Sequence, residues 1–147
     1  MPRPSLTRVV TFSAAHRYHR PDWSEERNRA TFGACANEHG HGHTYRCAVT
    51  VTGPLHPDTS MIVDLEMLDH ILDEEIVRPL DHQHINHAIP EFAFGRTIPT
   101  GEAVARYLWS RVAPRLPAGV FLHRVRVQED DRLYADCYGP DDEERTS

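Results

Sequence analysis

The feature that most constrains this chain is a run in which histidine alternates with glycine, His39-Gly40-His41-Gly42-His43. Alternate side chains of an extended strand point to the same face of a sheet. Two or three imidazoles therefore share one face, and the glycines leave the other face without side chains. This arrangement predicts a strand that holds a metal ion.

A further imidazole is available upstream at His16, where the β-rich segment 7–15 ends. Three histidine ligands with one open coordination position are typical of catalytic rather than structural zinc sites. The spacing does not decide which two of His39, His41 and His43 would bind. Binding of nickel or copper by the same cluster, without a physiological role, is the alternative.

Strands are predicted at 7–15, 45–52, 121–127 and 133–138, where β-branched and aromatic residues recur. Apolar residues at helical spacing predict one helix over 65–76, capped by Asp64, and a second helix that begins after Thr100. Segments 18–34 and 81–99 are predicted to be irregular, the first as a loop or lid. The order ββααββ predicts an α+β fold, in which an antiparallel sheet carries two helices on one face.

The composition is that of one globular domain, expected over 1–147, with a core at about 7–139 and an acidic tail at 140–147. The net charge of −6 does not favour a nucleic-acid partner, and no apolar run is long enough to span a membrane. Three irregularly spaced cysteines predict free thiols in a reducing compartment. The first residues lack the apolar stretch of a signal peptide, so a cytoplasmic location is expected.

Three other places in the sequence carry chemistry that spacing alone leaves open. Cys35, six residues before His41, is a fourth metal ligand, a general base or a buried structural thiol. Asp81 and His82 are either a carboxylate–imidazole pair that moves protons or part of an exposed turn. Glu129 is either exposed or a buried carboxylate that accepts two parallel hydrogen bonds from a guanidine-like edge of a purine or pterin.

Taken together, several segments of the chain resemble the 6-pyruvoyl tetrahydropterin synthase family. They are Phe12-Ser-Ala-Ala-His16-Arg17, Cys35-x5-His41-Gly-His43-x-Tyr45, Leu80-Asp81-His82, Pro99-Thr100-x-Glu102 and Val127-x-Glu129. The resemblance extends over about 8–138. It implies the tunnelling fold (T-fold), again with the order ββααββ, and a homohexamer of two stacked trimers whose active sites lie between subunits.

The resemblance also implies a role for individual residues. The metal would be zinc (Zn2+), with His16, His41 and His43 as ligands and His39 outside the ligand set. Cys35 matches the catalytic cysteine, Asp81 and His82 match its assisting pair, Glu129 matches the glutamate that anchors the pterin, and Thr100 with Glu102 match a segment that lines the pterin pocket.

The implied substrate is 7,8-dihydroneopterin triphosphate, which would lose triphosphate and tautomerise by internal redox to 6-pyruvoyl-tetrahydropterin without an external redox cofactor. Cations are needed for the triphosphate, and the candidates are Arg17, Arg20, Arg27 and Arg29.

Two alternatives remain at this level. The related 6-carboxytetrahydropterin synthase of queuosine biosynthesis uses the same substrate and zinc but also releases acetaldehyde. Its cysteine commonly lies four residues before the first histidine of the HGH element, whereas Cys35 lies six residues before His41, as in the pyruvoyl-forming branch. The second alternative is a non-catalytic protein that binds zinc or pterin; such a protein would not need Cys35, Asp81 and His82.

Overall fold

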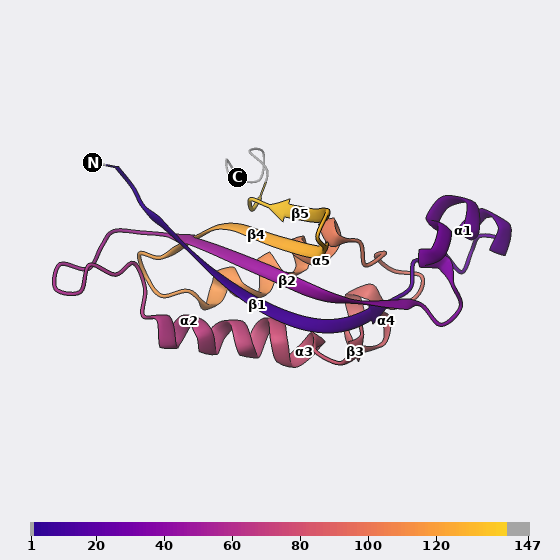
Figure 1. The fold of residues 1–147 in the computed structure, drawn as a ribbon, viewed down its shortest axis with the longest axis horizontal. Coiled ribbons are helices and arrows are strands. Elements are labelled where there is room, and N and C mark those ends of the chain that lie inside the picture. Colours follow the sequence, from indigo (N-terminus) through magenta and orange to yellow (C-terminus); the bar gives the residue numbers. More distant parts are fainter. Residues whose placement is uncertain (1, 141–147) are drawn as a thin grey trace.

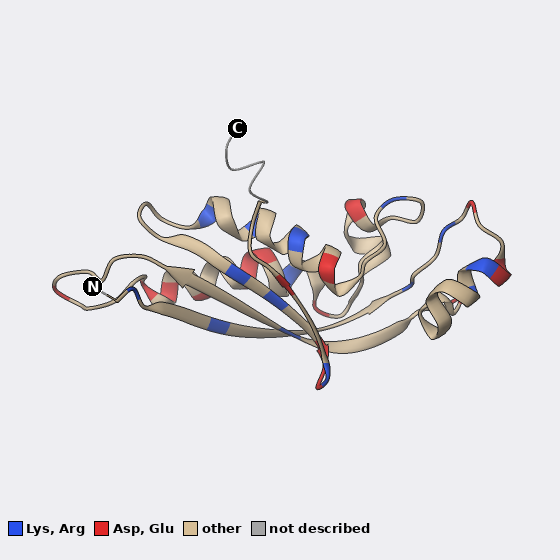
Figure 2. Cartoon of the chain, turned by 90° about the horizontal axis from the view of Figure 1, so that it is seen from above, with Lys and Arg blue, Asp and Glu red and all other residues tan. Residues whose placement is uncertain are grey.

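The computed structural model describes residues 2–140 and shows a long, curved β-sheet with its main helices on one side (Figure 1). The helices α2, α3 and α5 form this second layer, and none of the described residues forms a helix on the other face of the sheet (Figure 2). The helix α1 lies beyond one end of the sheet. The acidic tail predicted at 140–147 lies, apart from residue 140, outside the described residues.

Two long strands form the centre of the sheet. β1 (Ser5–His16) and β2 (His41–Thr52) run antiparallel and pair over their whole length. β4 (Phe121–Asp130) pairs with β2, and β5 (Leu133–Cys137) pairs with β4, both antiparallel. The four predicted strands are therefore confirmed, although β1, β2 and β4 extend beyond the predicted segments.

The prediction of a wholly antiparallel sheet is wrong, because a fifth strand lies parallel to β1. This strand, β3 (Gln83–His84), pairs with Ala14 and Ala15 at the outer edge of the sheet, so the order is β3-β1-β2-β4-β5. The backbone N–H of His82 also donates to the carbonyl of Ser13 at 2.6 Å. A two-residue strand is too short to show the alternation by which strands are predicted.

The two predicted helices are confirmed, and their caps are those expected from the sequence. In α2 (Leu65–Leu72) the Asp64 carboxylate accepts from the N–H of Glu66, and in α5 (Gly101–Val112) the Thr100 hydroxyl accepts from the N–H of Ala103. The first helix continues through a π-helical segment, Asp73–Val77, into α3 (Arg78–Leu80). In the described part of the chain no helix combines the length and apolar character needed to cross a membrane.

One apolar core lies between the sheet and these helices. The inward side chains of β1, β2 and β4 meet the apolar stripes of α2 and α5, as the fully buried Val49, Leu68 and Leu108 illustrate. Phe12 and Tyr45 stack across β1 and β2 with ring centroids 4.9 Å apart. This packing fixes the position of both long strands, and it extends to the strand ends that carry the histidines.

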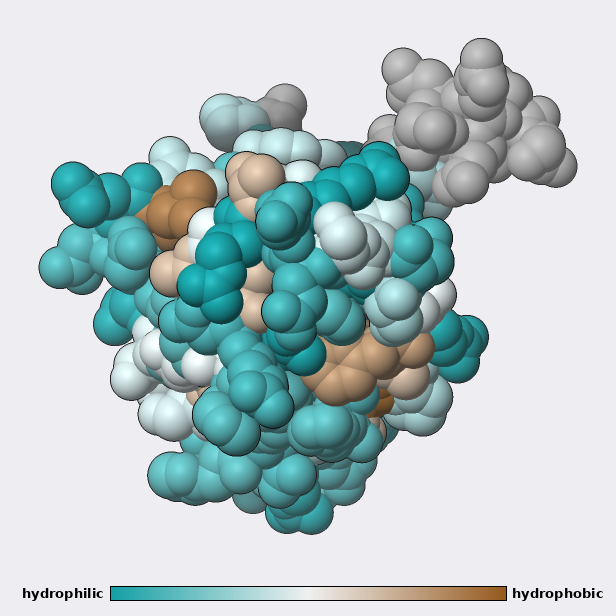
Figure 3. Space-filling view, turned by 90° about the vertical axis from the view of Figure 1, so that its right-hand side faces the viewer, coloured by the Kyte–Doolittle hydropathy of each residue, from teal (hydrophilic) through white to brown (hydrophobic). Residues whose placement is uncertain are grey.

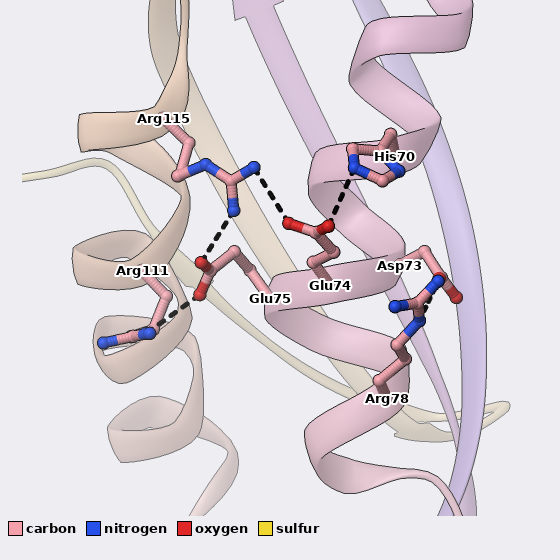
Figure 4. A network of polar contacts seen from close by, with 7 residues as sticks. All are labelled: His70, Asp73, Glu74, Glu75, Arg78, Arg111 and Arg115. Atoms are coloured by element: carbon pink, nitrogen blue, oxygen red, sulfur yellow. Dashed lines mark hydrogen bonds and ion pairs between the residues drawn. The ribbon is translucent and has the colours of Figure 1, made fainter.

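Ion pairs connect the two helical segments on the side away from the sheet (Figure 4). Glu75, in the π-helical segment, accepts hydrogen bonds from Arg111 of α5 and from Arg115, both at 2.9 Å. Glu74 accepts from Arg115 at 3.0 Å and lies 2.7 Å from His70. The glutamate side chains thus join the first helical segment to the second.

The segment 18–34 was predicted to be irregular, and this prediction is wrong in part, because the segment contains α1 (Glu25–Phe32). Ser24 caps this helix by accepting from the N–H of Arg27, and Asn28 is almost completely buried. The Asn28 amide accepts from the N–H of Arg20 at 2.7 Å and donates to the carbonyls of Arg20 and Ser24, both at 3.0 Å. Because α1 is held by the hydrogen bonds of the buried Asn28 amide, its sequence lacks the apolar periodicity by which helices are predicted.

Between α3 and α5 the chain forms only short elements, namely the strand β3, the helix α4 (Ile85–Ala88) and a single turn at Pro90–Phe92. Ile85 and Phe92 are buried in the core, while the backbone between them stays largely without regular structure. The segment 81–99 is therefore mostly irregular, as predicted, with the addition of β3 and α4.

Candidate active site

Three histidines meet where β1 ends and β2 begins. His16 pairs with His41 across the two strands, and Ala14 pairs with His43, so the three imidazoles lie on the same face as the core. The Nε2 atoms of His16 and His41 are 3.2 Å apart, and one nitrogen from each ring lies within 4.8 Å of the other two. The shared face predicted for His41 and His43 is therefore confirmed, and His16 of the neighbouring strand lies on the same face.

The histidine cluster has the properties of a metal site. Nε2 of His43 is buried and has no hydrogen-bond partner, which is unusual for a buried polar atom unless a metal or water binds it. Burial, followed by the neighbouring His43, His41 and His84, lowers the pKa of His16 to about 3, so its imidazole is neutral at physiological pH. Neutral imidazoles are the form that binds metals. The donor set therefore fits a divalent cation such as zinc.

His39 is not part of this cluster. It lies in the turn between residues 37 and 40 and is exposed. The turn itself depends on Gly40, whose φ of 70° is in the left-handed region; a Cβ there would lie 2.4 Å from the carbonyl oxygen of His16. The backbone of this turn therefore packs directly against the end of β1.

Cys35 lies beside the histidines, on the short 3-10 helix Gly33–Ala36. Its Sγ is 3.7 Å from Nε2 of His41, and the side chain is half-buried. Burial, and to a lesser extent the charge of Glu129, raise the pKa of this thiol. A divalent cation on the histidines would act in the opposite direction, because a nearby positive charge favours the thiolate.

Glu129 reaches the same end of the sheet from β4, where the pairing with β5 is irregular between Gln128 and Asp130. Its side chain is only 9% exposed, and Oε2 lies 3.8 Å from Nε2 of His43. Burial raises the pKa of Glu129, while the hydrogen bond from Tyr18 lowers it. The structure thus brings this carboxylate to the histidine cluster.

A small cavity of about 210 Å³ lies next to Glu129, and we call it the Glu129 cavity. Its lining includes Tyr18, Thr100, Gly101, Glu102, Glu129 and Tyr134. Thr100 and Glu102 belong to the first turn of α5, so the positive end of that helix faces the carboxylate. The hydroxyl of Thr100 is already engaged as the helix cap, at 3.1 Å from the N–H of Ala103.

Asp81 and His82 lie at a different place, on the edge of the sheet formed by β1 and β3. One Asp81 oxygen accepts from the N–H of Ser13 at 2.8 Å, and the other lies 3.6 Å from Nε2 of His82. The His82 side chain is 83% exposed, and its backbone has a φ of 60°. Within the described residues neither side chain forms a hydrogen bond or ion pair with Cys35.

The four arginines considered for the triphosphate differ in their contacts. Arg20 pairs with Asp22 at 3.3 Å, and Arg27 lies over the ring of Trp23. Arg17 and Arg29 both line a cavity of about 360 Å³ beside α1, which also contains Glu25 and Glu38. The end of the molecule that carries α1 is mainly hydrophilic, with small apolar patches (Figure 3).

Two tyrosines belong to the site: Tyr45, which ends the segment Cys35-x5-His41-Gly-His43-x-Tyr45 but was given no role, and Tyr18, which the sequence interpretation did not single out. The hydroxyl of Tyr45 lies 2.7 Å from Nδ1 of His16, and Tyr18 contacts both His16 and Glu129. Tyr45 follows His43 at the next position of the same face, so strand alternation would have found it. Tyr18 lies after the end of β1, where alternation no longer applies.

Comparison with known proteins gives a consistent picture. A sequence model described as 6-pyruvoyl tetrahydropterin synthase matches residues 5–140. The human 6-pyruvoyl tetrahydrobiopterin synthase is 40% identical over 126 residues, which cover 86% of this chain and 85% of the human protein. The Poecilia reticulata protein of the same name is 39% identical over 127 residues, 86% of this chain and 84% of that protein. The structure of Caenorhabditis elegans 6-pyruvoyl tetrahydropterin synthase superposes with a TM-score of 0.87 at 31% identity, covering 95% of this chain and 98% of the other.

Proposed function

This chain belongs to the 6-pyruvoyl tetrahydropterin synthase family, and we propose that it converts 7,8-dihydroneopterin triphosphate into 6-pyruvoyl-tetrahydropterin and triphosphate. It would therefore be a carbon–oxygen lyase that acts on a phosphate ester. The observation that carries the proposal is the meeting of three histidines, a thiol and a buried carboxylate at one end of the sheet. Such a set supplies a metal site, a base and an anchor for a pterin.

The proposed metal is zinc, held by His16, His41 and His43. When bound, zinc would polarise the hydroxyl groups of the substrate side chain and so make the adjacent C–H bonds more acidic. Tyr45 supports the ligand set, since its contact with Nδ1 of His16 leaves Nε2 directed to the cluster. The buried, unpartnered Nε2 of His43 also supports this assignment.

Cys35 is the proposed base. Its Sγ lies close enough to His41 to reach a substrate bound at the histidines, and it would remove a proton from the substrate side chain. His82, oriented by Asp81, would return or relay a proton during tautomerisation. The overall reaction is redox-neutral, because the carbon that is oxidised and the ring that is reduced belong to the same molecule.

Glu129 is the proposed anchor of the pterin ring. An ionised carboxylate accepts two parallel N–H groups, as the amino and ring N–H of a pterin present them, and this fixes the ring relative to the base. Thr100 and Glu102 would line the same pocket. Among the arginines, we propose Arg17 and Arg29 for the triphosphate, since both line the cavity of about 360 Å³ beside α1.

We further assign the chain to the tunnelling fold, as one domain that assembles into a homohexamer in the cytoplasm. The separation of Asp81 and His82 from Cys35 supports this assembly. His82 is exposed and Asp81 is half-buried, so from this sheet edge the pair can complete the site of a neighbouring subunit; within the described residues neither side chain forms a hydrogen bond or ion pair with the thiol of its own subunit. The active sites would then lie between subunits.

The proposal is tested by product analysis. Zinc-loaded protein is incubated with 7,8-dihydroneopterin triphosphate, and the products are identified by mass spectrometry together with an assay for acetaldehyde. A pyruvoyl pterin without acetaldehyde is the expected result. A carboxy pterin with an equivalent of acetaldehyde would instead assign the protein to the queuosine branch, and the absence of turnover by either route would contradict an enzymatic function.

A further inference from the structure

Tyr18 lies between the histidine cluster and the Glu129 cavity and touches both. Its ring is 4.7 Å from that of His16, measured between centroids, and its hydroxyl donates to Oε1 of Glu129 at 3.5 Å. The same side chain lines the Glu129 cavity. Building on the proposed function, we propose that Tyr18 is a positioning residue, which holds the Glu129 carboxylate in the orientation that binds the pterin ring.

The position of Tyr18 is fixed from several directions. Its backbone N–H donates to the carbonyl of Cys35 at 2.7 Å, which ties the end of β1 to the 3-10 helix that carries the thiol. Its ring also contacts Phe32 of α1 edge to face, with centroids 5.8 Å apart. A side chain held by backbone and by aromatic contacts on two sides loses little further freedom when it acts on a neighbour.

The orientation of the Glu129 carboxylate depends on which of its two oxygens lies near Tyr18 and which lies near His43. Tyr18 donates to Oε1, whereas Oε2 lies 3.8 Å from Nε2 of His43, beyond hydrogen-bond distance and beside the nitrogen assigned to the metal. Both oxygens keep further lone pairs, since each carboxylate oxygen accepts two hydrogen bonds. The donor on Oε1 therefore favours one orientation of the carboxylate before the substrate arrives, and the cost of ordering it on binding is reduced.

The Tyr18 hydroxyl also lowers the free-energy cost of burying the Glu129 carboxylate. Glu129 is only 9% exposed, and a buried carboxylate without donors loses solvation that the protein must replace. At 3.5 Å the Tyr18 contact is long, so it orients the carboxylate without competing strongly with the two N–H groups of a pterin. This role concerns binding of the ring, and the proton transfers take place elsewhere in the site.

The decisive experiment compares Tyr18→Phe with wild type, using neopterin affinity from fluorescence quenching, then KM and kcat for 7,8-dihydroneopterin triphosphate. Removal of one hydroxyl donor is expected to weaken neopterin binding and raise KM about three- to tenfold. The change in kcat should stay within about twofold, because uniform binding is lost rather than transition-state stabilisation. The zinc content should equal that of wild type.

Tyr138→Phe is the matched control, because the Tyr138 hydroxyl makes a similar long contact with a carboxylate, 3.4 Å from Asp136, away from the cavity. It should leave neopterin affinity and KM unchanged. Unchanged neopterin affinity and KM in Tyr18→Phe would overturn the proposal, as would a fall in kcat alone. Wild type that binds neopterin in a Tyr18-dependent way but forms no product would refute the proposed function and leave the role of Tyr18 standing. Wild type that binds no pterin would refute both.

Discussion

The hydroxyl of Tyr45 lies 2.7 Å from Nδ1 of His16, and both side chains are completely buried. An imidazole that binds a metal through Nε2 carries its proton on Nδ1. In the metal-bound state His16 would therefore donate to Tyr45, and this bond would set both the tautomer and the orientation of the ring. The opposite arrangement, with Tyr45 donating, would put the proton on the nitrogen that faces the cluster.

Tyr45→Phe should consequently weaken zinc binding about tenfold to a hundredfold, the effect typical of losing a group that orients a metal ligand. The Phe ring can still stack on Phe12, so the fold should persist. Competition with a chromophoric chelator measures the affinity. Tyr107→Phe, on the far helix α5, serves as control and should bind zinc like wild type; equal affinity in both variants would contradict the role of Tyr45.

Cys35→Ala should keep stoichiometric zinc and lose turnover, with kcat reduced about 10²- to 10⁴-fold as expected for removal of a general base. Cys137→Ala provides the control, since Cys137 is a half-buried residue of β5 and should be replaceable without loss of activity. Zinc analysis and steady-state kinetics on the same preparations separate the two effects. Normal turnover in Cys35→Ala would show that another group acts as the base.

Mixed oligomers test whether Asp81 and His82 serve a neighbouring subunit. Cys35→Ala and His82→Ala should each be inactive, yet co-expression of the two should restore activity, because some sites then combine an intact thiol with an intact imidazole. Cys35→Ala mixed with Glu129→Gln should restore none, since Cys35 and Glu129 lie at the same histidine cluster of one chain. Inactivity of both mixtures would mean that the site does not form between subunits in the proposed way.

The pair formed by Asp136 and Arg126 gives a prediction on acid stability. Arg126 donates to both Asp136 oxygens, at 2.7 and 3.0 Å, and this bond lowers the pKa of Asp136 below its ordinary value of 3.8. The stabilisation is therefore complete above about pH 4 and is lost as the pH falls through the lowered pKa.

Asp136→Asn should lower the free energy of unfolding at neutral pH by about 1 kcal/mol. The difference from wild type should shrink toward pH 2, because protonation of Asp136 progressively removes the charge that Arg126 binds. Urea unfolding at both pH values measures it. A difference that does not change with pH would contradict the proposed origin of the stabilisation.

Glu75 joins the π-helical segment to α5 and is only 11% exposed. Glu75→Gln should reduce the free energy of unfolding by about 1 to 2 kcal/mol, because two arginines lose a nearly buried partner. Glu74→Gln, whose side chain is 32% exposed, should have the smaller effect of a surface ion pair. Denaturant titration of both variants checks the order, and the reverse order would show that burial does not decide it.

Much of the fold follows from short-range patterns. The long strands and the helices α2 and α5 follow from apolar spacing and from the caps at Asp64 and Thr100. The parallel strand β3 and the helix α1 do not, since one is too short for a pattern and the other is held by the hydrogen bonds of Asn28. Both depend on contacts between residues that the sequence does not place side by side.

The residues of the candidate site likewise fall into those that a local sequence pattern predicts and those that it does not. Alternation predicts that His41 and His43 share a face, and the end of β1 brings His16 to them. That Glu129 reaches His43, or that Tyr18 reaches Glu129, depends on how β4 and the turn after β1 are arranged in three dimensions. The sequence also left open whether Asp81 and His82 move protons or form an exposed turn, because adjacent residues give no information on which edge of the sheet they occupy.

The pairing of His16 with His41 has an evolutionary consequence. A cation bound at this pair would clamp the two ends of the intervening loop, 17–40, in the manner of a covalent cross-link. Lengthening a loop whose ends are fixed costs little conformational entropy, about 0.6 kcal/mol per doubling. The loop that carries the thiol can therefore be remodelled by insertion or deletion while the histidines keep their places, which offers descendants of such a protein a route to new chemistry on an inherited metal centre.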